Sequence, residues 1–258
     1  MPTFRTTARR TLAALALLAA PAAAARAQLA ANVVYNGSAT TATAFDYHVG
    51  PVTETLTFTG GVGRSVTVTA FCVDLANQIT NGATYTANVT SLGDVLAGRS
   101  TLATTRQGAA GLDGYKKAAY LIDQFQSAGV ASLAGTQRDQ TWGALQGALW
   151  SLFTPTAVTL DASTSTTDAT VIEYWQAQAN AFAKSAAFGT YNYARFSIIT
   201  DVNAAGKLSG AGVQEFMTAA PVTANVVPEP ATVALLGAGL VAVAGVARRR
   251  VAPRAVEA

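Results

Sequence analysis

The chain has 258 residues, of which 50% are hydrophobic and 12% are charged, so it is long enough to bury a good core. Its net charge of +3 originates at the ends, because eight of the 17 basic residues but only two of the 14 acidic ones lie outside positions 28–227. The nine basic and 12 acidic residues that remain give this central region a net charge of −3, which argues against a nucleic-acid partner.

The first segment of the chain has the pattern of a secretory signal peptide. Three arginines within the first ten residues precede an apolar run at 12–25, and a small-x-small triplet ends at Ala27. This order is the one that export signals use. Residues 1–27 are therefore expected to be removed after Ala27, which leaves Gln28 as the first residue of an exported protein.

The region 28–218 is predicted to form a single α+β domain. Alternation of polar and apolar residues predicts strands, and helical periodicity occupies the centre of the region. The expected strands are 32–35, 44–49, 52–59, 65–75, 84–90 and 191–199, and the expected helices are 115–125, 136–154 and 168–185, the second capped by Thr136. This order indicates a β-rich exported domain with a helical insertion of about three helices.

Two stretches carry the candidate chemistry. Phe71-Cys72-Val73-Asp74 ends the strand at 65–75 and places Cys72 on its apolar face. Leu145-Gln146-Gly147-Ala148-Leu149-Trp150 lies on the second helix and places Gln146 on an apolar face. A buried primary amide is costly unless its polar groups find partners, and a covalent bond to the thiol would remove the amide NH2 group altogether.

These two motifs resemble those of the thioester domains of bacterial surface adhesins. In that family, the cysteine sulfur and the glutamine side-chain carbonyl form an internal thioester, which nucleophiles on a target surface can open. The resemblance spans about 65–155 and includes the helical segment 115–122. It implies a thioester between Cys72 and Gln146, and a surface or matrix nucleophile as the partner, either a protein amine or a polysaccharide hydroxyl.

A supporting pocket is expected around the implied bond. Phe71, Trp142 and Trp150 would exclude water and so slow hydrolysis of the thioester. Asp74 and Tyr120 would position the incoming nucleophile. Asp74 has an alternative role as a solvated acid or a cap at the end of the strand.

A second interpretation of Cys72 stays open. It is the only cysteine, so an intramolecular disulfide is excluded, and a free buried thiol packs like a small hydrophobe. The chain would then be a non-covalent structural or interaction protein of an exopolysaccharide matrix. An enzyme is not expected, because His48 is the only histidine and no protease or transglutaminase signature surrounds Cys72. No catalytic residue, metal or cofactor is therefore predicted.

The C-terminal end has three parts in a fixed order. Pro228, Glu229 and Pro230 precede an apolar run at 231–247, and three arginines follow at 248–250. This order resembles the PEP-CTERM sorting signal of exopolysaccharide-producing bacteria, in which the tripeptide marks processing. The run is near the lower length limit for a membrane-spanning helix, and the arginines would hold its end in the cytoplasm.

The resemblance implies a linker at 219–227 and a sorting signal at 228–258. The chain would be anchored transiently in the cytoplasmic membrane, processed by the sorting machinery, and released to the cell surface or the extracellular matrix. A permanent single-pass anchor is the alternative.

Overall fold

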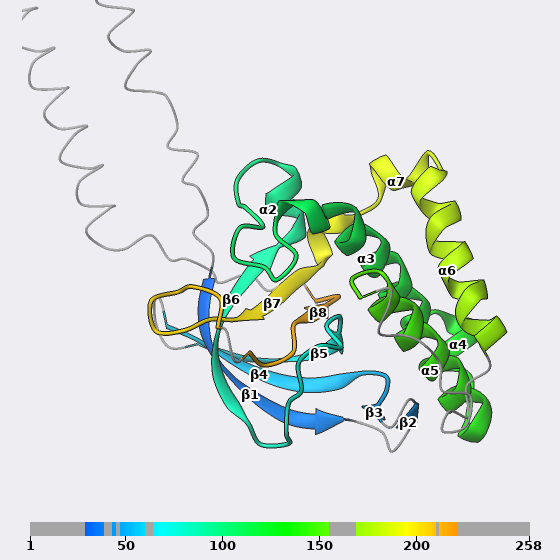
Figure 1. Ribbon diagram of the computed structural model, residues 1–258, viewed down its shortest axis with the longest axis horizontal. Helices are drawn as coiled ribbons and strands as arrows, with labels where there is room; N and C mark the ends of the chain where they lie inside the picture. The colour runs from blue at the N-terminus through cyan, green and yellow to red at the C-terminus, as the bar shows by residue number, and fades with distance from the viewer. Residues whose placement is uncertain are drawn as a thin grey trace, which may run out of the picture.

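The computed structural model describes residues 29–38, 43–44, 47–59, 64–154, 169–209 and 212–220 (Figure 1). The predicted signal peptide with Ala27, and the sorting tail with Pro228, Glu229 and Pro230, lie outside these residues. Within the described part of the chain, none of the helices is long and apolar enough to cross a membrane.

Six strands form a closed antiparallel barrel in the order β1-β4-β5-β8-β7-β6. The strands are β1 (Leu29–Ser38), β4 (Val52–Phe58), β5 (Ser65–Cys72), β6 (Thr84–Ser91), β7 (Ser197–Asp201) and β8 (Phe216–Thr218). The alternation of buried and partly exposed residues explains how these strands form the wall of the barrel. In β4 every second residue, starting at Val52, is buried inside, while its neighbours are partly exposed. A separate pair, β2 (Thr43–Ala44) and β3 (Tyr47–His48), takes the place of the single strand expected at 44–49.

Three long helices lie on one side of the barrel (Figure 1). They are α3 (Leu112–Gln126), α5 (Gly135–Ser151) and α6 (Ala169–Lys184), close to the expected ranges. The described residues also form the short helices α2 (Leu92–Leu96), α4 (Ala128–Ala131) and α7 (Ala187–Thr190), so the expectation of about three helices was too low. A helix of four or five residues makes little more than one turn and leaves no periodic pattern in the sequence.

The core has two clusters, which meet at β5 and α5. One cluster fills the barrel, and the other lies between the barrel and the helices. Side chains of β5 alternate between them, so that Cys72 belongs to the barrel cluster and its neighbour Phe71 to the helix cluster. On α5 every residue from Gly143 to Trp150 is buried, which explains why this part of the helix is apolar on all sides apart from Gln146.

Two other details of the predicted elements were wrong. Thr136 does not cap α5, because the helix begins at Gly135 and its cap residue Ala134 makes no side-chain capping bond. The last of the predicted strands, expected at 191–199, is β7 and begins only at Ser197, after a 3₁₀ turn at Tyr193–Arg195. The aromatic residues at 191–196 favour a strand in isolation, yet here they pack on one another around that turn.

Candidate functional site

Cys72 is the last residue of β5 and pairs with Phe216 of β8. Its side chain points into the barrel cluster together with Val68 and Ala70, as the alternation of the strand predicts. Burial raises the pKa of the Cys72 thiol to about 12, so the sulfur keeps its proton at neutral pH.

Helix α5 brings Gln146 to the end of β5. The Gln146 side chain is 1% exposed, and its Nε2 donates a hydrogen bond to the carbonyl oxygen of Cys72 at 2.6 Å. This bond satisfies one of the two amide N–H groups that burial removes from water. The structure therefore brings the two residues of the predicted pair into direct contact, through the side chain of one and the backbone of the other.

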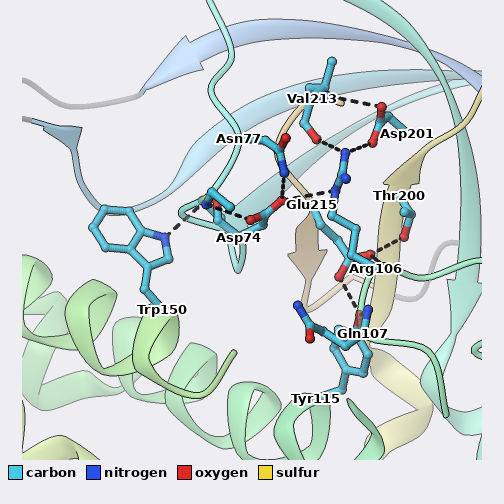
Figure 2. Close-up of polar contacts among 12 residues, drawn as sticks. Asp74, Asn77, Arg106, Gln107, Tyr115, Trp150, Thr200, Asp201, Val213 and Glu215 are labelled. Carbon is cyan, nitrogen blue, oxygen red and sulfur yellow. Dashed lines mark hydrogen bonds and ion pairs between the residues drawn. The ribbon is translucent and has the colours of Figure 1, made fainter. Parts of the chain in front are cut away.

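Trp150 contacts the sulfur itself. Its indole Nε1 donates to Cys72 Sγ at 3.4 Å, and the thiol in turn donates to the backbone oxygen of Asp74 at 3.1 Å. The Tyr47 ring meets the Trp150 ring edge to face, with 6.0 Å between centroids. In Figure 2 the indole points toward the segment that carries Asp74. Trp150 thus covers the thiol and supplies a hydrogen-bond donor to it.

Two residues of the predicted pocket lie elsewhere. Phe71 packs on the other side of β5 against Phe125 of α3, with ring centroids 4.8 Å apart. Tyr120 stacks on Phe182 of α6, with centroids 4.6 Å apart. Adjacent strand residues point to opposite faces, and for this reason Phe71 cannot share the surroundings of the Cys72 thiol.

Trp142 borders both core clusters but makes no hydrogen bond to the sulfur. Its ring packs against the turn at Gly50, where an added Cβ would come within 2.7 Å of the indole. The Arg138 guanidinium lies over the ring at 5.0 Å, and the buried Nε1 has no hydrogen-bond partner among the described residues. Trp142 therefore seals the edge of the site by packing alone.

The Asp74 carboxylate holds the loop that follows β5. One oxygen accepts a hydrogen bond from the backbone N–H of Ala76 at 2.9 Å, and the other accepts from Asn77 Nδ2 at 2.5 Å. The second oxygen also lies 3.1 Å from Arg106 Nε, an ion pair without hydrogen-bond geometry. These contacts favour the interpretation of Asp74 as a cap, with a structural role, over that of a group which positions a nucleophile.

Arg106, which the sequence did not single out, joins three loops beside the site (Figure 2). Its guanidinium pairs with Asp74 and Asp201 and donates to the backbone oxygen of Val213 at 2.7 Å. Its backbone N–H donates to Glu215 Oε2 at 2.9 Å. The partners lie up to 109 positions away in the chain, so no local pattern could have revealed the cluster.

Glu215 lies at the centre of this cluster. Its carboxylate accepts from Tyr115 Oη at 2.5 Å and from Thr200 Oγ1 at 2.6 Å, while its backbone oxygen accepts from Val73 N–H at 2.9 Å. Burial raises the pKa of Glu215 above its ordinary value. The last contact fixes the backbone immediately after Cys72, which holds the thiol at its place against α5.

Comparison with known proteins identifies one part of the chain. Residues 226–250 match the family model of the PEP-CTERM protein-sorting motif. The chain is an exported protein. The match confirms the sorting signal that the sequence predicted and indicates delivery to the cell surface or the matrix. Neither the curated proteins nor the solved structures gave a match, so the comparisons lend no support to the resemblance to thioester domains.

A buried acid lies inside the barrel of this exported domain. Glu54 of β4 is fully buried, and its Oε1 accepts a hydrogen bond from Tyr85 Oη at 2.6 Å. The other oxygen, Oε2, has no partner within the described residues. Burial raises the pKa of Glu54 from 4.5 to about 7, and the hydrogen bond from Tyr85 offsets only part of that rise.

Glu54 is expected to make stability depend on pH. The folded state keeps the Glu54 proton up to about pH 7, whereas the unfolded chain releases it near pH 4.5. Unfolding therefore releases a proton in this window, and the free energy of unfolding falls as the pH rises, by ~3 kcal/mol in total. Glu54→Gln keeps an acceptor for Tyr85 and should be more stable than the natural protein above pH 7. Urea unfolding of both proteins at several pH values measures their free energies of unfolding. A difference between the two free energies that stays constant from pH 4.5 to 7 would contradict the prediction.

Proposed function

We propose that this exported protein attaches covalently to its target through a thioester between Cys72 and Gln146. The observation that carries the proposal is the 2.6 Å contact of the Gln146 amide with Cys72 in a buried position. The buried indole of Trp150 keeps water from the sulfur, and exclusion of water is what a thioester needs to survive until a nucleophile reaches it.

The chemistry balances without a cofactor. Cys72 Sγ attacks Gln146 Cδ, the new C–S bond replaces the C–N bond, and the thiol proton leaves with the amide nitrogen as ammonia. A target amine then attacks the same carbon, the C–S bond breaks, and a proton from the amine returns to the sulfur. The products are a substituted amide at Gln146 and a free Cys72 thiol. A polysaccharide hydroxyl would give an ester instead, and neither reaction turns over as an enzyme does.

Intact mass tests this proposal directly. The mature protein should weigh one ammonia less than its sequence and should resist alkylation of the thiol. Methylamine should open the bond, add one amine at Gln146 and release one titratable thiol. Cys72→Ala and Gln146→Ala should each abolish the mass deficit, whereas Gln137→Ala, an exposed amide on the same helix, should keep it.

Full sequence mass together with an alkylatable Cys72 would refute the thioester. The second candidate, a non-covalent structural protein of the exopolysaccharide matrix, would then stand. What favours it is that the Cys72 thiol already accepts from Trp150 and donates to Asp74, which is how a buried inert thiol is satisfied.

We also propose that the apolar tail anchors the protein in the cytoplasmic membrane only until it is processed at Pro228, Glu229 and Pro230. The support is the position of the sorting motif over 226–250. Mapping of the C-terminal peptide of the protein from its native host should end near Pro230. Retention of the tail through Arg250 would favour a permanent anchor.

A further inference from the structure

We propose that the Trp150 indole N–H activates the Cys72 sulfur, as the nucleophile when the thioester forms and as the leaving group when it opens. This inference rests on the thioester proposed above and assigns a role to the 3.4 Å contact between Trp150 Nε1 and Cys72 Sγ. Trp150 is thereby a catalytic residue, because its N–H touches a reacting atom.

Both steps place negative charge on the sulfur. In formation, the thiol gives up its proton as it attacks the amide carbon, and in opening the electron pair of the C–S bond moves to sulfur. Burial opposes that charge and raises the pKa of the thiol. A hydrogen bond donated to the charged form counters the effect of burial, and the bond from Trp150 is the largest of the influences that lower this pKa.

The contacts at Asp74 give less of this help. The backbone oxygen of Asp74 accepts from the thiol at 3.1 Å, which stabilises the protonated sulfur. The Asp74 backbone lowers the pKa of the thiol by less than the Trp150 indole does, and the Asp74 carboxylate raises it. Trp150 is therefore the main group that favours charge on the sulfur.

The spacing on α5 explains how one helix provides both groups. Gln146 and Trp150 are four positions apart, so their side chains project from the same face in successive turns. The Cys72 carbonyl holds the departing nitrogen of Gln146 at 2.6 Å, and Trp150 holds the sulfur at 3.4 Å. The edge contact with Tyr47 fixes the indole in this orientation.

Trp175 of α6 provides a matched control, because its ring packs against the cluster between the barrel and the helices and not beside Cys72. Its indole N–H is also buried but has no hydrogen-bond partner among the described residues. Replacement by phenylalanine removes an N–H at either position and keeps an aromatic ring. Only Trp150→Phe removes a hydrogen bond to the sulfur.

The experiment compares the natural protein with Trp150→Phe and Trp175→Phe. Intact mass first shows which proteins carry the ammonia deficit, and the release of thiol by methylamine then gives the rate of opening. Trp150→Phe should open about tenfold to hundredfold more slowly, the factor that a hydrogen bond to a charged group provides. The pH dependence of alkylation after opening should show a higher thiol pKa in Trp150→Phe, and Trp175→Phe should match the natural protein in both measurements.

The outcomes separate this inference from the proposal on which it rests. Full mass in the natural protein refutes the thioester itself. A deficit in all three proteins with equal opening rates overturns the role of Trp150 and leaves the thioester intact. A folded Trp150→Phe without the deficit, beside Trp175→Phe with it, supports activation of the forming step. If Trp150→Phe does not fold, 3-benzothienylalanine at position 150 keeps the two-ring shape without the N–H; slow opening supports the inference, and a natural rate overturns it.

Discussion

Arg106→Leu should destabilise the folded domain by about 3–5 kcal/mol, the usual effect of removing one partner from a buried ion pair. Asp74 is 5% exposed and Asp201 is 3% exposed, so without the guanidinium both carboxylates would be buried with no cation beside them. The backbone oxygen of Val213 would lose its donor as well. The result should be a large decrease in the urea concentration at the midpoint of unfolding.

Arg138→Leu is the control for this prediction. Arg138 pairs with Asp139 on α5 with about a third of each side chain exposed, so loss of the pair should change stability by less than ~1 kcal/mol. Equal stability of the two variants would show that the cluster around Arg106 does not hold the loops beside Cys72. The Arg106 variant should also alkylate faster at Cys72 if the thiol is free, because the loop after β5 depends on this cluster.

Local pattern predicted much of the fold because β4, β5, α3 and α6 each have a clear period. The alternation of β5 gave the inward direction of Cys72, and the apolar surroundings of Gln146 gave its burial. What the pattern could not provide was closure of the barrel, since β8 has three residues and joins β7, the strand before it, to β5, which is distant in the chain. A strand this short leaves no alternation to detect.

In the candidate site, too, the sequence predicted one part, and tertiary packing decided the rest. Contact between Cys72 and Gln146 was expected from the resemblance, but the surroundings were not, because they depend on tertiary packing. Phe71 was placed in the pocket by its position next to Cys72, although alternation along β5 sends it to the opposite side. Glu54 was overlooked for a different reason. The alternation of β4 places it inside the barrel, but acidic residues are rarely fully buried, so a hydrophobic pattern does not predict one at an inward position.

Trp150→Ala should cost about 3–5 kcal/mol, the range for removal of a large aromatic side chain from a core. Trp150 is 1% exposed and belongs to the barrel cluster, whereas Leu145 and Leu149 of the same helix belong to the other one. Its ring is therefore the part of α5 that enters the barrel, and its removal would leave a cavity beside Cys72 and Tyr47.

Trp142→Ala is expected to cost less than Trp150→Ala, about 1–2 kcal/mol, because the Trp142 ring is only partly buried and its indole N–H has no hydrogen-bond partner in the described part of the chain. The sequence alone placed both rings in the pocket, and the structure buries Trp150 more fully than Trp142. Urea unfolding of both variants measures the difference. Stability of Trp150→Ala close to that of the natural protein would contradict the packing of α5 into the barrel, and with it the position of Gln146 against Cys72.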